Sequence, residues 1–211
     1  MIRVLIVDDH PVVRRGLREI LADERNIEVS ETADPHEALG MIREQSWSLI
    51  VLDIDLPGKG GLELLKDVRR ERPRLPVLIL SVYPEEQFAL RTLRAGASGY
   101  LSKDSAPGDL VKVVRKILRG EKYFGERVVE QLLSNPNDKA TTAYPHELLS
   151  DREFQVLRLF GSGLTVKEIA QELSLSRPTV STYRARILEK MRMQTTAELV
   201  RYAVQNRLVN Q

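Results

Sequence analysis

Five polar side chains in the first half of the sequence lie where a phosphoryl group could be bound and accepted. They follow short apolar runs: Asp8 and Asp9 after residues 4–7, Asp53 after 49–52, Ser81 after 77–80 and Lys103 after 99–101. Carboxylates brought close together repel one another, and a hard divalent cation such as Mg²⁺ relieves that repulsion through oxygen ligands. With the metal and a lysine ammonium neutralising phosphoryl oxygens, one carboxylate could attack in line and become an aspartyl phosphate.

A parallel β-sheet is the structure that would bring these side chains together. Short β-branched runs bounded by charge, proline or glycine are typical of buried parallel strands. We expect strands at residues 4–7, 27–30, 49–52, 77–80 and 99–101. Helical spacing between them predicts buried faces formed by Val12, Val13, Leu17, Ile20 and Leu21, by Ala38, Leu39 and Ile42, by Leu62, Leu65 and Val68, and by Leu110, Val113, Val114 and Ile117. Residues 1–120 are therefore predicted to form an α/β doubly wound five-stranded parallel sheet, with ligands beyond the carboxyl ends of its strands.

The rest of the chain predicts helices alone. In the region 148–211, Ser150 and Thr165 each begin a capping box, with glutamate three residues later. A very short turn at residues 174–176 joins the second helix to a third one that is rich in arginine. Two helices joined by so tight a turn indicate a helix-turn-helix, so we predict a small all-α domain here.

Charge is distributed unevenly along the chain. Residues 1–120 carry 19 basic and 19 acidic side chains, residues 121–147 carry 3 and 5, and residues 148–211 carry 10 and 6. Only the last region has a basic excess, which suggests that this region alone meets a polyanion. Residues 121–147 are expected to connect the two domains through a short helix at 126–133 and a polar linker at 134–147.

The composition places the protein in a broad class. With 42% apolar and 29% charged residues, it is typical of soluble globular proteins. The absence of cysteine excludes disulfides and thiolate metal sites, and favours a reducing cytoplasm. Two aspartates come before any signal-peptide core could form, and no apolar run approaches the roughly 20 residues of a membrane helix. We therefore expect a cytoplasmic protein with no membrane partner.

Taken together, the residues after the strands resemble the receiver domain of bacterial two-component response regulators, over about residues 1–120. The resemblance implies that Asp53 accepts a phosphoryl group from a sensor histidine kinase. It further implies an Mg²⁺ site and a phosphate-sensing switch. The implied metal ligands are Asp8, Asp9, Asp53 and the backbone carbonyl of Asp55, and the implied switch residues are Ser81, Tyr100 and Lys103.

Residues 148 to about 209 resemble the LuxR-type helix-turn-helix domain of the NarL/FixJ class of regulators. The resemblance is carried by the opening Leu-Ser-x-Arg-Glu, by Lys-Glu-Ile-Ala in the second helix and by Ser-x-x-Thr-Val at the start of the third. It implies binding to double-stranded DNA, and a homodimer on a repeated site when the protein is phosphorylated. The candidate DNA contacts are Thr165, Lys167, Arg177, Thr179, Ser181, Thr182, Arg184, Ala185, Arg186 and Lys190.

This chain departs from the family pattern in its third helix. Many members carry lysine and histidine where Ser181 and Tyr183 stand, so the base-reading residues cannot simply be transferred. We expect Ser181, Thr182 and Ala185 to face the groove. The final helix, with Leu199 among its apolar residues, could form a dimer face or could belong to the core.

A haloacid-dehalogenase-like phosphatase is the main alternative. That family uses an Asp-x-Asp pair after a strand, which Asp53 and Asp55 match literally, with the second aspartate as general acid. Here the pair follows the third predicted strand and not the first. Pro57 stands where that family has a small hydroxyl or apolar residue, and no room remains in the chain for a substrate cap. We therefore predict a switch that carries a phosphate and is not an enzyme.

Overall fold

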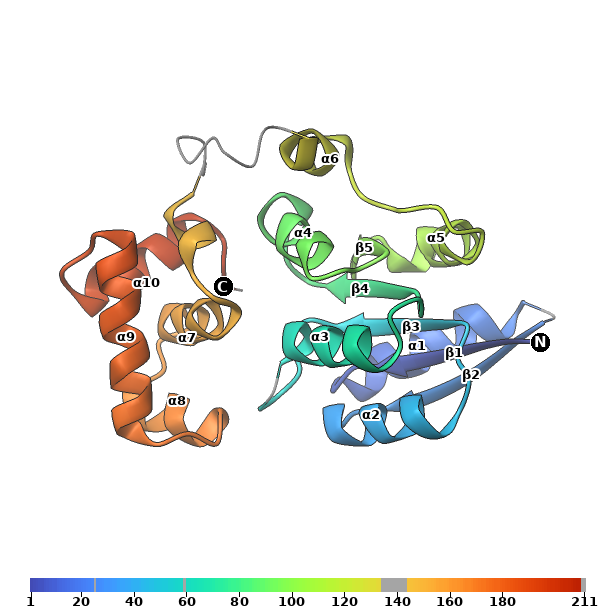
Figure 1. Cartoon of the computed structure of the whole chain (residues 1–211), viewed down its shortest axis with the longest axis horizontal. Coiled ribbons are helices and arrows are strands. Elements are labelled where there is room, and N and C mark those ends of the chain that lie inside the picture. The colour runs from blue at the N-terminus through green and yellow to red at the C-terminus, as the bar shows by residue number, and fades with distance from the viewer. Residues whose placement is uncertain (25, 59, 134–143, 210–211) are drawn as a thin grey trace. The chain divides into compact units, whose positions relative to one another are not determined.

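The computed structural model describes residues 1–24, 26–58, 60–133 and 144–209, which form two compact units, Met1–Leu132 and Leu133–Gln211 (Figure 1). Most of the linker predicted at residues 134–147 falls on 134–143 and so lies outside the described residues.

The first unit contains a five-stranded sheet in which every pairing is parallel, in the order β2-β1-β3-β4-β5. The strands are β1 (Ile2–Val7), β2 (Ile27–Thr32), β3 (Leu49–Asp53), β4 (Val77–Ser81) and β5 (Gly99–Ser102). The helices between and after them are α1 (Pro11–Ala22), α2 (Pro35–Glu44), α3 (Gly61–Glu71), α4 (Glu85–Arg94), α5 (Ala106–Leu118) and α6 (Glu126–Leu133). The predicted doubly wound parallel sheet is confirmed, and its order is the flavodoxin-like one.

Helices cover both faces of the sheet, because the strands are apolar on both sides. Alternate residues of β1, β3 and β4 pack with α1 and α5 in one core cluster. Most of the remaining residues of these strands are also buried, and α2, α3 and α4 cover the other face of the sheet (Figure 1). A strand that is buried on both faces can be apolar throughout, and this explains the unbroken apolar runs of β3 and β4.

The strand register sets the carboxyl ends of the central strands side by side. Val7 pairs with Leu52, and Asp53 pairs with Leu80 in the next strand. Ser81 pairs with Ser102, immediately before Lys103. The polar residues that follow these strands are therefore collected along one edge of the sheet.

Two details of the predicted helices differ from the structure. Val12 is 85% exposed and does not belong to the buried face of α1, because Pro11 starts the helix and turns its first residues to solvent. The helix α4 is absent from the predicted periodic faces, although Phe88, Ala89 and Leu90 are buried.

The second unit consists of the short 3₁₀ helix at Pro145–Leu148 and four α-helices. These are α7 (Asp151–Gly161), α8 (Val166–Glu172), α9 (Arg177–Met191) and α10 (Thr196–Gln205). Both predicted capping boxes are present: Ser150 and Thr165 accept from the backbone of Glu153 and Glu168, whose carboxylates bond back. Ser174 adopts a left-handed conformation with φ of 52° and so allows the sharp turn between α8 and α9.

The apolar side of α10 belongs to the core of the second unit. Leu199 and Ala203 are fully buried, and the helix packs against α7. Of the two possibilities left open for this helix, the structure supports the core, so these side chains are not available as a dimer face.

Candidate functional site

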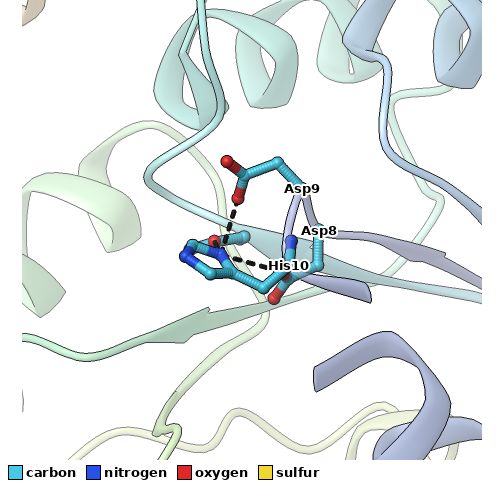
Figure 2. Close-up of side chains that lie close together, drawn as sticks. Asp8, Asp9 and His10 are labelled. Carbon is cyan, nitrogen blue, oxygen red and sulfur yellow. Dashed lines mark hydrogen bonds and ion pairs between the residues drawn. The ribbon is translucent and has the colours of Figure 1, made fainter. Parts of the chain in front are cut away.

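The first part of the site lies in the turn from β1 to α1. Asp8 is 1% exposed, and its Oδ1 accepts a hydrogen bond from the backbone N–H of His10 at 2.8 Å. Its carbonyl accepts from the Arg14 guanidinium at 2.6 Å, which fixes the turn to the first helix. Asp9 is more exposed, and Figure 2 shows the His10 ring turned toward its carboxylate, with Nδ1 2.7 Å from Oδ1. Two carboxylates and an imidazole therefore share one small region.

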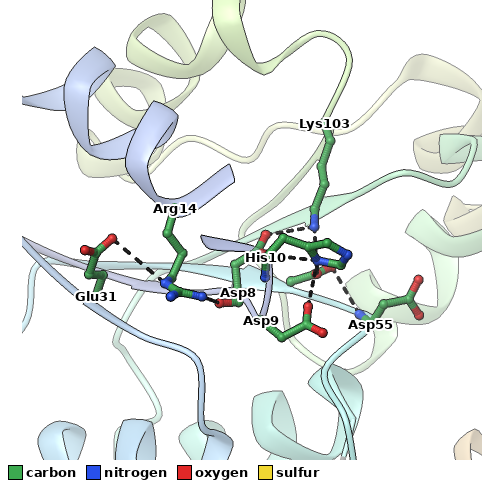
Figure 3. A network of polar contacts seen from close by, with 8 residues as sticks. Asp8, Asp9, His10, Arg14, Glu31, Asp55 and Lys103 are labelled. Atoms are coloured by element: carbon green, nitrogen blue, oxygen red, sulfur yellow. Dashed lines mark hydrogen bonds and ion pairs between the residues drawn. The ribbon is translucent and has the colours of Figure 1, made fainter. Parts of the chain in front are cut away.

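The second part is the carboxylate of Asp53 at the end of β3, which is 1% exposed. Its Oδ1 accepts from the backbone N–H of Asp55 at 3.1 Å, and its Oδ2 accepts from Lys103 Nζ at 2.7 Å. Lys103 Nζ also lies 2.8 Å from Asp8 Oδ2, so one ammonium joins the ends of three strands (Figure 3). These contacts bring the predicted acceptor, acidic residue and lysine together.

Gly61 is required by the close approach of α3 to the acceptor strand. A Cβ atom added at this glycine would overlap the carbonyl oxygen of Asp53. The first helical residue can therefore pack directly on the acceptor's backbone, where its N–H donates to the Ile54 carbonyl at 3.1 Å.

Burial and charge perturb the ionisation of this site. The pKa of Asp53 is raised to about 6, chiefly by burial; Lys103 opposes this shift and the charge of Asp8 adds to it. Burial alone would lower the pKa of Lys103, but the carboxylates of Asp53 and Asp8 raise it overall. The lysine therefore stays charged at neutral pH, whereas Asp53 keeps its negative charge at a cost in free energy.

The donor set fits a hard divalent cation. Ligand atoms of Asp8, Asp9, His10 and Asp53 all lie within 4.8 Å of one another. Within the described part of the chain, Asp8 Oδ2 and Asp9 Oδ1 are buried without a partner in hydrogen-bonding geometry, although Lys103 Nζ and His10 Nδ1 respectively lie nearby. Carboxylate oxygens with unused capacity suit Mg²⁺, which prefers oxygen ligands and retains water. The role of the Asp55 carbonyl stays a prediction.

Ser81 and Tyr100 are connected through Tyr83. Ser81 is fully buried, and its Oγ accepts from the Tyr83 backbone N–H at 3.1 Å. The Tyr100 hydroxyl donates to the Tyr83 carbonyl at 2.9 Å. Tyr100 is only 1% exposed, so its side chain is fully buried. One residue of the β4–α4 loop thus bonds to two of the three predicted switch residues.

In the second unit, α9 presents most of the predicted DNA contacts to solvent. Its exposed residues from that set are Arg177, Thr182, Arg184, Ala185, Arg186 and Lys190, whereas Thr179 and Ser181 are partly buried. Lys167 on α8 is exposed as well. Lys167 and the exposed cations of α9 thus lie on two helices that pack together, and we call them the basic surface of α8 and α9.

Four of the predicted contacts also have structural partners, and one of them is Thr179, whose hydroxyl lies 2.7 Å from that of Ser176. Thr165 caps α8 and bonds to Glu168, and the Thr182 hydroxyl donates to the Pro178 carbonyl at 3.0 Å. Lys190 Nζ lies 2.6 Å from the Oε2 atom of Glu153, a carboxylate that is 3% exposed. Lys190 therefore ties α9 to α7, and this role is distinct from the one predicted for it.

Comparisons with known proteins identify the family of each domain. Residues 4–115 match the response regulator receiver domain, and residues 147–203 match the bacterial regulatory proteins of the luxR family. The chain belongs to the two-component response regulators. It is 34% identical to the response regulator UvrY of Escherichia coli strain K12 over 211 residues, which is 100% of this chain and 97% of UvrY.

Two solved structures of RcsB are similar to this response regulator. One is RcsB from Salmonella enterica serovar Typhimurium bound to the promoter rprA with the phosphomimetic BeF3-. It is 26% identical, with a TM-score of 0.70, and the match covers 97% of this chain and 99% of that one. The other contains two RcsB dimers bound to two parallel DNAs, with 28% identity, a TM-score of 0.58 and coverage of 97% and 98%.

The site of this response regulator contains residues that the sequence analysis did not select. His10 follows the aspartate pair directly, and its position alone could have identified it. Tyr83 has no such signal, because its contribution is made by backbone atoms. Among the residues that the structure describes, no helix has the length and apolar character needed to span a membrane.

Proposed function

We propose that this response regulator accepts a phosphoryl group on Asp53 from a sensor histidine kinase and thereby changes its affinity for specific DNA sequences. The observation that carries the proposal is the contact of Lys103 Nζ with the buried carboxylates of Asp53 and Asp8, in a chain that also bears a basic helix-turn-helix. The similarity to RcsB, solved on promoter DNA with a phosphomimetic, supports the same coupling. The chain is divided for this purpose into a receiver at residues 1–120, a connection at 121–147 and a DNA-binding domain at 148–211.

The acceptor chemistry follows from the placement of charges. An oxygen of Asp53 attacks phosphorus in line, the P–N bond to the donor's imidazole breaks, and a P–O bond to Asp53 forms. The Lys103 ammonium neutralises a phosphoryl oxygen and reaches Asp8 at the same time. Asp8, Asp9 and Asp53, with the Asp55 carbonyl, would hold Mg²⁺, whose charge favours the approach of an anionic phosphoryl group.

The switch acts through the loop after Ser81. The Ser81 hydroxyl accepts from the Tyr83 N–H and has a proton that it can donate to a phosphoryl oxygen, and a turn of the side chain toward that oxygen would move Oγ away from the Tyr83 N–H. A movement of Tyr83 weakens its bond to the Tyr100 hydroxyl, so the two residues change conformation together. Phosphate at one edge of the sheet is thereby communicated to α4 and β5.

DNA recognition belongs to the basic surface of α8 and α9. Arg177, Arg184 and Arg186 are exposed and can reach phosphates or base edges, and Lys167 stands in the first turn of α8. The partly buried Ser181 has less reach than its exposed neighbours Thr182 and Ala185. A homodimer on a repeated site would double these contacts, and the RcsB dimers on DNA support that form.

The protein acts in this proposal as a carrier of one phosphoryl group and not as a turnover enzyme. The Asp53 carboxylate is engaged by Lys103, and the Asp55 backbone N–H donates to it. A sensor kinase and chromosomal DNA both meet such a protein in the cytoplasm. The phosphatase alternative predicts repeated hydrolysis of small phosphate esters, which a steady-state phosphate assay would detect.

A mass measurement tests the acceptor. The full chain is incubated with acetyl phosphate and Mg²⁺, and its intact mass is compared with that of Asp53→Ala treated in the same way. We expect the wild type to gain one phosphoryl group and the variant to gain none. Equal gain by both chains, or no gain by the wild type, would contradict the proposal.

A DNA-binding measurement tests the coupling. Phosphorylated and untreated chains select duplexes from a random pool, and the affinity for the enriched sequence is measured at several salt concentrations. We expect phosphorylation to tighten binding, and the affinity to fall steeply as salt rises. A salt-independent affinity would argue against contacts to the phosphate backbone.

A further inference from the structure

His10 lies at the acidic site in a position that helix formation does not explain. It is the N-cap residue of α1, yet its side chain makes no capping hydrogen bond. Its backbone N–H donates to Asp8 Oδ1 and its carbonyl accepts from the Arg14 backbone, so the residue is fixed at both ends. The ring is turned toward the carboxylates instead, as Figures 2 and 3 show.

We propose that His10 is an additional ligand of the divalent-cation site, and that it makes the site favour imidazole-preferring ions such as Ni²⁺ over Mg²⁺. The proposal rests on the proposed function only in that both use the same carboxylates.

The imidazole nitrogen already lies close to oxygen atoms of three carboxylates. Nδ1 of His10 lies 2.7 Å from Asp9 Oδ1, 3.3 Å from Asp8 Oδ1 and 4.0 Å from Asp53 Oδ2. Two atoms that each lie about 2.1 Å from an octahedral ion are about 3.0 Å apart when adjacent and about 4.2 Å apart when opposite. One ion can therefore contact Nδ1 and the carboxylates after small movements of side chains.

Exposure and existing contacts leave room for such an ion. The His10 side chain is 60% exposed, whereas those of Asp8 and Asp53 are each 1% exposed, so the imidazole forms the solvent side of the cluster. Lys103 contacts the other oxygen of Asp8, Oδ2, and leaves Oδ1 on the side of His10. At Asp8 the ammonium and a bound ion would use different oxygens, whereas at Asp53 they would share Oδ2, which lies 2.7 Å from Lys103 Nζ.

The chemistry of the ligand set decides which ion binds more tightly when His10 takes part. Carboxylate and water ligands suit Mg²⁺, whereas imidazole suits Ni²⁺, Cu²⁺ and Zn²⁺, and is a frequent ligand of these ions. A nitrogen ligand adds little to the affinity for Mg²⁺, which the carboxylates alone can hold. An ion bound also by His10 has one coordination position fewer for a phosphoryl oxygen, so the choice of ion would bear on how readily Asp53 is phosphorylated.

Calorimetric titration of the tag-free, metal-depleted full chain tests this assignment. NiCl₂ and MgCl₂ are titrated separately into the wild type, His10→Ala and His10→Asn. Asparagine is a favourable N-cap residue, so the second variant protects the start of α1. The matched control is His36→Ala, because His36 is exposed near the start of a different helix, α2.

The ratio of the Ni²⁺ affinity to the Mg²⁺ affinity is the deciding quantity. Since the loss of even an outer-shell partner often costs about 10-fold to 100-fold in metal affinity, the ratio should fall at least tenfold in both His10 variants. The His36 variant should keep the wild-type ratio. A ratio unchanged in His10→Asn, a wild type without preference for Ni²⁺, or an equal loss in the His36 variant would overturn the proposal.

The acetyl phosphate experiment on the wild type separates this inference from the proposed function. A chain that binds Ni²⁺ through His10 but gains no phosphoryl group on Asp53 would refute the function alone. A chain that gains the phosphoryl group but shows no dependence of the metal ratio on His10 would refute the ligand assignment alone.

Discussion

Replacing Asp53 by asparagine should stabilise the metal-free receiver unit at neutral pH. In the folded protein burial raises the pKa of Asp53 from an ordinary value of 3.8 to about 6. At about 1.36 kcal/mol per pKa unit, this difference corresponds to roughly 3 kcal/mol of the free energy of unfolding. The amide of the variant would have no charge to desolvate, and Lys103 would keep its contact with Asp8. We therefore expect Asp53→Asn to raise the free energy of unfolding by up to roughly 3 kcal/mol at pH 8.

The pH window follows from the sign of the shift. Because the folded pKa lies above the unfolded one, the penalty is complete above pH 6, where Asp53 is ionised in both states. It disappears as the pH falls toward 3.8, where the carboxyl is protonated in both states. Other carboxylates lose favourable contacts over the same range, so the informative quantity is the difference between the two proteins. That difference should shrink from pH 8 to pH 4.

Urea unfolding followed by tryptophan fluorescence can measure this difference. The chain has one tryptophan, Trp47, and it lies in the receiver unit, so the signal reports that unit and not the DNA-binding one. The exposed Asp104→Asn serves as the matched control and should have little effect. Mg²⁺ should stabilise the wild type more than Asp53→Asn, because the cation offsets the same repulsion. An Asp53→Asn variant that is no more stable than the wild type at pH 8, or equally stabilised at pH 4, would refute the reasoning.

Four further outcomes are expected. Tyr100→Phe removes a buried hydroxyl and should destabilise the receiver by about 1–3 kcal/mol in the same urea assay; a neutral result would mean that its hydrogen bond contributes nothing. Lys190→Met should lower the thermal stability of the DNA-binding unit by about 1 kcal/mol, since it leaves the buried Glu153 carboxylate without its cation, though Lys190 is partly solvated; a more stable unit would contradict this. Arg184→Ala should reduce the salt slope of DNA binding by about one if it contacts a phosphate, whereas loss of sequence preference would indicate a base contact. Asp55→Asn should lengthen the lifetime of the phosphorylated protein, measured by mass over time, because a carboxylate beside the acceptor can take a proton from attacking water; an unchanged lifetime would remove Asp55 from this role.

The fold and the acceptor cluster were predictable because they depend on patterns along the chain. Uninterrupted apolar runs mark strands that are buried on both faces. Parallel strands place their carboxyl ends at one edge of the sheet, so Asp8, Asp53 and Lys103 were expected to lie close together. The contact of Lys190 with Glu153 was not predictable in this way. It joins side chains 37 residues apart, and an exposed lysine on a basic helix has the same local sequence pattern with or without such a partner.

The same distinction applies within the receiver unit. The period of the sequence shows which helix faces are apolar, but it does not show where a helix starts relative to solvent, so Val12 was assigned to the wrong side. Helix α4 is short, and its buried residues among those described, Phe88, Ala89, Leu90 and Thr92, do not form a long apolar stripe, so its periodic signal is weak. The link from Ser81 to Tyr100 passes through backbone atoms of Tyr83, and such contacts leave no mark on residue type.

The contacts of residues 121–125 give the receiver a direct connection to the chain that leaves it. The Tyr100 backbone N–H donates to the Tyr123 carbonyl at 2.9 Å, and Gly99 makes this approach possible, because a Cβ there would lie 3.0 Å from the same oxygen. Gly125, just before α6, donates its N–H to the side chain of Glu85, the first residue of α4. The elements that move in the proposed switch, α4 and β5, therefore bond to the segment that leads into α6. A shift of α4 and β5 must act on that segment through these bonds, and this requires no contact between the two units.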